Sequence, residues 1–178
     1  IRHILPLYPF LFVWLGGVVA ALWARGSKSI RCALLLLATW TVGSTLAIHP
    51  DYLAYFNEAA GGPDHGHKIL VDSNLDWGQD LKGLKTWMER NKVDKIQLAY
   101  FGTANPVYYG IDADYLPGTF FSRLSENAAT AHKATHVAVS ATYLMGYNLL
   151  NPNAYSVLRQ QTPVAVIGHS IWVFKLQS

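Results

Sequence analysis

The densest group of side chains that could do chemistry lies in the segment DSNLDWGQD, which begins at Asp72. Asp72, Asp76 and Asp80 follow one another at intervals of four residues, a pattern that invites comparison with a cation-binding loop. An EF-hand loop counted from Asp72 needs a glycine at its sixth position and a glutamate at its twelfth, where this chain has Trp77 and Gly83. The pattern therefore favours other roles over a dedicated metal site.

Two of these residues also fit the start of a helix. Asp76 can act as an N-cap, with Gln79 at the third helical position completing a capping box. Asp72 and Asn74 have no such role and are better candidates for ligand binding, the alternative being an Asx-turn after a strand. The adjacent indole ring of Trp77 could stack on a bound molecule.

Other familiar catalytic patterns are missing from the sequence. His65 and His67 form an H-x-H pair without a third ligand nearby, which is typical of a solvated loop. The sequence has no G-x-S-x-G nucleophile elbow, dinucleotide fingerprint or P-loop. We therefore assign no catalytic residue and no cofactor to this chain from its residues.

The elements around the acidic turn follow from hydrophobic periodicity. A strand is predicted over Ile69–Asp72, an amphipathic helix over Gly78–Arg90 and a second strand over Lys95–Phe101. The helix should bury one face made of Leu81, Leu84, Trp87 and Met88. These elements form a βαβ unit.

The rest of the domain is expected to repeat the alternation. A strand is predicted over Ala134–Ser140, a helix over Pro152–Gln160, and two strands around Gly168 over Val164–Ile167 and Ile171–Lys175. Pro106–Lys133 is expected to hold a short helix and turns. The predicted fold class is α/β: a small, mainly parallel sheet covered by helices, with a final antiparallel hairpin at its edge.

This topology places polar turns together. Ligands of open α/β sheets bind beyond the carboxyl ends of the strands. Three turns follow predicted strands: Asp72–Asn74, Gly102–Asn105 and Ser140–Tyr143. We expect a sugar or an acceptor peptide at this shared edge, where Asn105, Tyr108 and Tyr109 could add hydrogen bonds and stacking.

Two uncharged stretches precede the domain. Ile4–Ala24 has 21 residues and Cys32–Ile48 has 17, against roughly 17 to 25 for a membrane-spanning helix. The connecting loop carries Arg25, Lys28 and Arg31 without an acid, which predicts a cytoplasmic loop. Both outer ends should then be extracytoplasmic. Predicted boundaries are 1–50 for the two helices, 51–67 for an interfacial helix and linker, and 68–178 for the α/β domain.

Charge outside the membrane is balanced. From His49 onward, 10 basic residues stand against 11 acidic ones, a formal charge of −1. Because no basic face appears there, we predict no nucleic-acid partner. Arg2 lies just before the first span and could grip a lipid phosphate through paired hydrogen bonds; ordinary interfacial anchoring is the alternative.

Five segments carry a resemblance to a known family. RHILPLYPFL, HPDYLAYFNEAAGGP, DSNLDWGQDLKGLKTW, AYFGTANPVYYGI and IGHSIWVFKL occur in this order. Together they resemble the carboxyl-terminal part of bacterial C-type membrane glycosyltransferases related to protein O-mannosyltransferases. The resemblance implies inverting transfer of a sugar from a polyprenyl-phosphate donor to a protein or glycan acceptor at the outer face of the inner membrane.

The resemblance also implies a division of labour. The family's catalytic acid lies in an early outward loop that has no counterpart here, and the chain starts at Ile1 without Met, so we expect the tail of a longer enzyme, inactive by itself. Substrate-binding roles then fall to Arg2, Asp72, Asn74, Trp77 and Asn105, with membrane lipid as a further partner. The resemblance leaves room for a divalent cation in the complete enzyme.

Two other functions remain open. The chain could be a two-span membrane protein whose outward domain is a binding or assembly module without catalysis, docking through the aromatic residues between Tyr52 and Phe56. A membrane-anchored hydrolase that uses the aspartate cluster is the weakest option, since neither a nucleophile nor a complete metal shell can be named.

Overall fold

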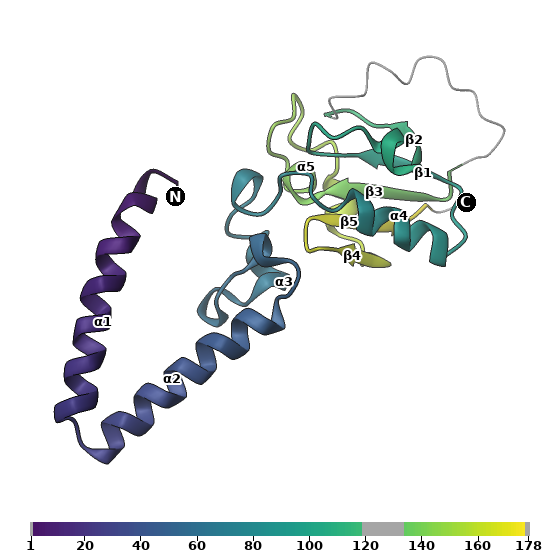
Figure 1. Cartoon of the computed structure of the whole chain (residues 1–178). Coiled ribbons are helices and arrows are strands. Elements are labelled where there is room, and N and C mark those ends of the chain that lie inside the picture. The colour runs from purple at the N-terminus through teal and green to yellow at the C-terminus, as the bar shows by residue number, and fades with distance from the viewer. Residues whose placement is uncertain (1, 119–133, 177–178) are drawn as a thin grey trace. The chain divides into compact units, whose positions relative to one another are not determined.

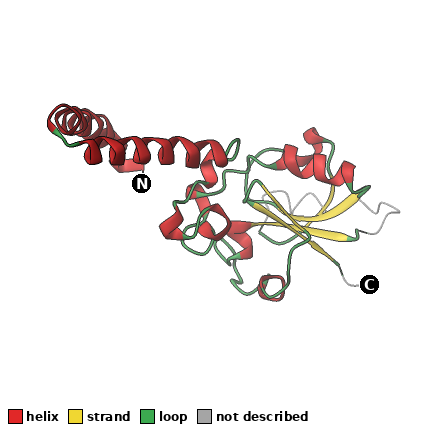
Figure 2. Cartoon of the chain, turned by 90° about the horizontal axis from the view of Figure 1, so that it is seen from below, coloured by secondary structure: helices red, strands yellow, loops and turns green. Residues whose placement is uncertain are grey.

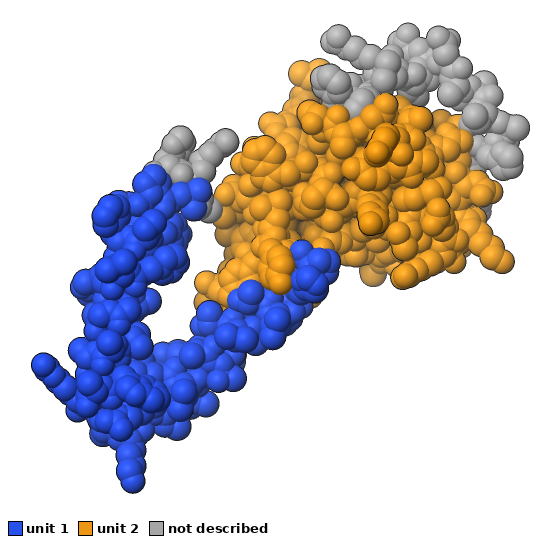
Figure 3. Space-filling model, in the orientation of Figure 1, with its two compact units in different colours: residues 1–50 blue, residues 51–178 orange. Residues whose placement is uncertain are grey.

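The computed structural model describes residues 2–118 and 134–176 (Figure 1). The chain divides into two compact units, Ile1–Pro50 and Asp51–Ser178 (Figure 3).

The first unit consists of helices. The 3₁₀ helix η1 (Arg2–Leu7) leads into α1 (Tyr8–Arg25), and α2 (Lys28–Ala47) follows after two residues. The helical stretches Ile4–Arg25 and Lys28–Ala47 are both long and apolar enough to cross a membrane.

The second membrane-length helix starts four residues earlier than the uncharged stretch suggested. The side chain of Ser27 caps α2 by accepting a hydrogen bond of 3.4 Å from the amide of Ile30, so Lys28 and Arg31 lie in the first helical turn. Arg31 Nε donates to the carbonyl of Trp23 at 2.8 Å and satisfies one of the orphan acceptors in the last turn of α1.

The second unit is built on one five-stranded sheet of order β2-β1-β3-β5-β4. Its strands are β1 (Lys95–Ala99), β2 (Asp112–Tyr115), β3 (His136–Ser140), β4 (Ala165–Ile167) and β5 (Ile171–Lys175). β1 is parallel to β2 and β3, whereas β5 is antiparallel to β3 and β4. The α/β class is confirmed. The sheet is mixed: among the described strands, β1, β2, β3 and β4 run in one direction, and β5 of the final hairpin runs against them.

The final hairpin forms at the sheet edge as predicted. Gly168 and His169, at the centre of its turn, have φ angles of +56° and +60°. Positive φ at both central residues is the type I′ geometry, whose twist matches that of the flanking strands.

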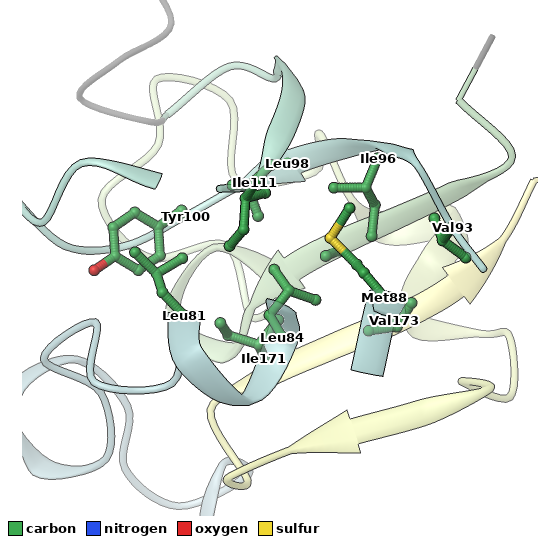
Figure 4. Packing of buried hydrophobic residues seen from close by; sticks show 11 residues of the cluster. Leu81, Leu84, Met88, Val93, Ile96, Leu98, Tyr100, Ile111, Ile171 and Val173 are labelled. Atoms are coloured by element: carbon green, nitrogen blue, oxygen red, sulfur yellow. The ribbon is translucent and has the colours of Figure 1, made fainter. Parts of the chain in front are cut away.

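Helices cover both faces of this sheet (Figure 2). On one face, α4 (Leu81–Arg90) buries Leu81, Leu84 and Met88 against Ile96, Leu98 and other residues of the sheet (Figure 4). On the other face, α5 (Ala141–Leu144) and α6 (Ser156–Arg159) pack on alternate strand residues, including Ala99, Val137 and Phe174. The predicted apolar face of the helix is confirmed, with Trp87 partly buried at its margin.

The predicted strand over Ile69–Asp72 does not form. Backbone amides of Lys68, Ile69 and Leu70 donate to the carbonyls of His65 and Gly66, so they are turned away from any sheet. The chain continues into the 3₁₀ helix η4 (Asp72–Asn74). The prediction of a first βαβ unit is therefore wrong. The parallel neighbours of β1 are β3 and β2, and the sequence did not suggest a strand at β2.

Two predicted helices are shorter than expected. Gly78 has a φ of +76°, which no right-handed helix accommodates, so α4 begins at Leu81. After Pro152 the chain makes turns, with Asn151 Oδ1 accepting from the amide of Asn153 at 3.0 Å, and only α6 is helical. The predicted second βαβ unit does not form as a pair of neighbouring strands either, because β5 lies between β3 and β4 and is antiparallel to both. Between Pro106 and Lys133, the expected short helix is η5 (Pro106–Tyr109), and residues 119–133 lie outside the described residues.

The second unit begins with short turns that pack on it. These are η2 (Tyr52–Ala54), η3 (Glu58–Ala60) and α3 (Pro63–Gly66). Ala54 is buried with Val71, Leu75 and Ala141, and the ring of Phe56 packs against the same cluster. The segment after the second membrane-length helix therefore contributes to the core of the α/β unit.

Candidate functional site

The candidate site lies where β1 and β3 end. These strands are parallel, so their exits lie on the same edge of the sheet. Ser140 Oγ accepts a hydrogen bond of 2.9 Å from the amide of Phe101, which joins the two exits. Thr142 Oγ1 accepts one of 3.0 Å from the amide of Asp72. The three polar turns predicted to share an edge come together, although no strand precedes the first.

Asp72 is held by its backbone and leaves its side chain exposed. Its φ of +60° is unusual for a residue with a side chain, and the bond to Thr142 helps to fix it. Its carbonyl accepts from the amides of Leu75 and Asp76, so a 3₁₀ turn follows it. Asn74 is half-buried, and its Nδ2 donates to the Val71 carbonyl at 3.4 Å.

Trp77 projects from the same loop. Its side chain is 59% exposed, and its Nε1 donates to the Ser73 carbonyl at 2.9 Å. The backbone amide of Trp77 donates to Gln79 Oε1 at 2.8 Å. An exposed ring anchored at both its indole nitrogen and its backbone is a preorganised stacking surface.

The other predicted binding residues have different surroundings. Asn105 caps η5 through its Oδ1, which accepts from the Val107 amide at 3.0 Å, so that oxygen has a structural role. Tyr108 and Tyr109 follow it, with ring centroids 5.6 Å apart, and Tyr108 is 86% exposed. Arg2 opens η1, and its side chain lies outside the described part of the chain.

Beneath the exposed loop lies a buried carboxyl group that sequence reasoning placed wrongly. Asp76 is fully buried and does not cap α4. Its Oδ1 accepts from the Gly78 amide at 2.8 Å, and its Oδ2 has no hydrogen-bond partner among the described residues. Burial raises the pKa of Asp76 to about 7. The Gly78 amide and the Ser140 hydroxyl favour the charged carboxylate and so oppose this rise.

Asp80, at the end of this loop, is half-buried. Ser170 Oγ donates to its Oδ2 at 2.5 Å, which ties the start of α4 to the β4–β5 turn. Burial raises the pKa of Asp80 to about 6, and the bond from Ser170 opposes that rise. A Cβ on Gly168 would lie 2.2 Å from the Asp80 carboxyl, so only glycine fits there.

Tyr100 completes the base of the site. Its hydroxyl donates to the Gly78 carbonyl at 2.7 Å. Cβ atoms on Gly78 and Gly102 would lie 2.1 Å and 2.4 Å from that hydroxyl oxygen, so the two glycines enclose it. Burial, and then the charge of Asp76, raise the pKa of Tyr100. The two glycines were visible in the sequence, but only the fold shows that they meet.

The histidine pair differs from the solvated loop that its spacing suggested. His65 Nδ1 lies 3.0 Å from the Gly61 carbonyl at the surface, whereas His67 is buried with its ring 4.5 Å from that of Trp172. Burial lowers the pKa of His67. Within residues 2–118 and 134–176, no group of three or more His, Cys, Asp or Glu side chains is placed to hold a metal ion.

The edge thus combines an exposed carboxylate, a half-buried amide and an anchored indole over a rigid buried base. Such a set can hydrogen-bond hydroxyl groups and stack on a ring, which suits recognition of a polar organic ligand. No protein-family model, curated protein or solved structure matches the chain.

Proposed function

We propose that this chain belongs to an integral-membrane glycosyltransferase that moves a sugar from a polyprenyl-phosphate donor to a protein or glycan acceptor. Its membrane-length helices hold the soluble unit at the outer face of the membrane, and that unit recognises the acceptor at the edge formed by Asp72, Asn74 and Trp77. The resemblance of the five sequence segments suggests the reaction.

One observation carries the acceptor role. The loop with Asp72 and Trp77 is tied to the exit of β3 through Thr142, while both residues are exposed. Hydroxyl groups of a sugar or peptide can donate hydrogen bonds to the Asp72 carboxylate. The ring of the same ligand can stack on the flat apolar face of Trp77. The ordering of these groups before binding limits the entropy lost on association.

The reaction itself would proceed by displacement. An acceptor oxygen attacks the anomeric carbon, the bond from that carbon to the phosphate oxygen breaks, and polyprenyl phosphate leaves with the electron pair. A carboxylate outside this chain accepts the proton of the acceptor. Arg2 is proposed to hold the phosphate of the donor, where a guanidinium forms paired, charge-assisted hydrogen bonds.

A transfer assay tests this function. The gene product that contains this chain is incubated in membranes with polyprenyl-phosphate-linked sugars and candidate acceptors. Trp77→Ala should raise the KM for the acceptor roughly five- to tenfold, equivalent to about 1 to 1.5 kcal/mol, and leave the KM for the donor unchanged. Trp77→Phe keeps the ring and should retain most of the acceptor affinity.

A binding or assembly module without catalysis is the second candidate. It is favoured by large side chains between Tyr52 and Tyr55 that point outward. The same assay separates the two functions: such a module binds a partner but consumes no donor. Failure of every polyprenyl-phosphate sugar to be transferred would overturn the glycosyltransferase proposal.

A further inference from the structure

The first turn of the second unit exposes three large side chains in a row of five residues. Tyr52, Leu53 and Tyr55 are 50%, 39% and 45% exposed, whereas Ala54 is 1% exposed and Phe56 packs against the core. Ala54 and the partly buried Phe56 fix the backbone of this turn to the α/β unit. The other three side chains must therefore face away from that unit.

The chain connection limits what these side chains can reach. α2 has 20 residues and is about 30 Å long, the thickness of a bilayer's hydrocarbon core. Tyr52 follows the last residue of α2, Ala47, by five positions, which span at most about 18 Å when fully extended. The amide of His49 donates to the carbonyl of Leu46, and this turn shortens the path. A membrane-crossing α2 therefore delivers Tyr52 to the headgroup layer or its immediate surface.

The exposed residues have the chemistry of that layer. A tyrosine combines an apolar ring with a hydroxyl, and tyrosines are enriched where membranes meet water. Leu53 adds apolar surface between them. The segment from Asp51 to Glu58 contains two acids and no Lys or Arg, so the segment itself offers no electrostatic attraction to anionic lipids. Zwitterionic lipid is sufficient.

We infer that Tyr52, Leu53 and Tyr55 lie in the headgroup region of the bilayer and hold the start of the α/β unit on the lipid surface. This inference requires that α2 crosses the membrane and is independent of the transfer reaction. The occupant of this surface is lipid, not water and not another protein.

Site-directed spin labelling tests the inference. Cys32, a free and exposed cysteine, is first replaced by serine, and single cysteines are introduced as Tyr52→Cys, Tyr55→Cys and, as a control, Tyr108→Cys. Tyr108 is the same residue type, 86% exposed, and lies after β1. The full chain is labelled and reconstituted in phosphatidylcholine nanodiscs. Collision rates with oxygen and with a water-soluble nickel chelate are then measured.

The labels at 52 and 55 should collide with oxygen more and with nickel less than the label at 108, and raising the salt concentration should leave this difference unchanged. Equal nickel accessibility at all three positions would place the segment in water. Low accessibility to both reagents at 52 and 55 would place it against protein. Either result would overturn the inference. Tyr52→Trp provides a second test, since lipids brominated near the headgroup should quench the added fluorescence.

Discussion

Asp76 illustrates how one buried carboxyl group can govern a loop. Its Oδ1 accepts a hydrogen bond from the Gly78 amide and so helps to fix the bend next to Trp77. Its Oδ2 is buried and has no hydrogen-bond partner among the described residues. A buried charge without full compensation is costly, so the neutral form is favoured and the pKa rises to about 7. The folded protein therefore binds this proton more tightly than the unfolded chain does.

Replacing Asp76 by asparagine should reveal that cost. The pKa of Asp76 in the folded chain lies above its ordinary value of 3.8, so its contribution to the free energy of unfolding is greatest below pH 4. That contribution falls as the pH rises towards 7 and is lowest above it. The free energy of unfolding of Asp76→Asn, relative to that of wild type, should therefore rise by about 4 kcal/mol between pH 4 and pH 8.

Denaturant unfolding of the whole chain in detergent micelles, followed at several pH values, measures this difference. Asp80→Asn offers a graded comparison: the pKa of Asp80 is raised only to about 6, so the gain should be smaller and complete at a lower pH. Parallel stability curves for wild type and Asp76→Asn would show that Asp76 does not take up its proton in this range.

Among the elements, the loop before α4 and the exit of β1 meet at the Tyr100 hydroxyl. That hydroxyl bonds to the Gly78 carbonyl and fills the space between Gly78 and Gly102. The contact sets the distance between the loop that carries Trp77 and the edge of the sheet. It therefore links the packing of an element to the geometry of the candidate site.

The substitution Gly78→Ala should be much more damaging than Gly110→Ala. The two glycines have similar positive φ angles, 76° and 70°, and a residue with a side chain pays roughly 1–2 kcal/mol for a left-handed backbone. A Cβ on Gly78 would lie 2.1 Å from the Tyr100 hydroxyl oxygen, whereas a Cβ on Gly110 would meet a side-chain carbon of Lys85 at 3.6 Å, which is an ordinary contact. Gly78→Ala should lose a further 1–3 kcal/mol, roughly, because of overpacking. Thermal unfolding of both variants measures the difference, and equal losses would contradict the enclosed Tyr100.

Local patterns predicted some elements and not others. The face of α4 follows from the helical spacing of Leu81, Leu84 and Met88, and the hairpin follows from Gly168 between two apolar runs. Residues 69–72 looked like a strand, but hydrogen bonds to His65 and Gly66 prevail there. β2 has the sequence DADY, whose polar–apolar alternation covers only four residues and includes two aspartates, a residue type that is depleted in strands. It forms by pairing with β1.

The same limit applied to the site. The carboxyl-edge rule correctly brought the three polar turns together. The bond from Asp72 to Thr142 joins residues 70 positions apart, and the meeting of Gly78 with Gly102 depends on Tyr100. Such contacts leave no periodic trace in the sequence. Asp76 was misplaced because its capping pattern was plausible locally, while the positive φ of Gly78 delays the helix.

At the scale of the whole molecule, the two units satisfy different solvents. α1 and α2 contain no buried residue among those described, and their apolar side chains suit lipid. The hydrophobic clusters of the second unit draw only on residues from Ala54 onward. Every described residue of these hydrophobic clusters therefore lies within residues 51–178.

A chain of residues 51–178 should fold by itself, and a chain of residues 68–178 should be strongly destabilised. The shorter chain lacks Ala54 and Phe56, which cover Val71, Leu75 and Ala141. Removing a packed aromatic ring typically costs about 3–5 kcal/mol, a large part of a total of roughly 5–15 kcal/mol. Urea unfolding followed by circular dichroism and by tryptophan fluorescence should give one coincident transition for 51–178 and a lower midpoint for 68–178. Equal midpoints would instead make residues 51–67 a linker that the α/β unit does not need. A lower midpoint for 68–178 would make residues 51–67 part of the core of the unit. Tyr52 and Tyr55 would then belong to a folded surface and not to a flexible linker.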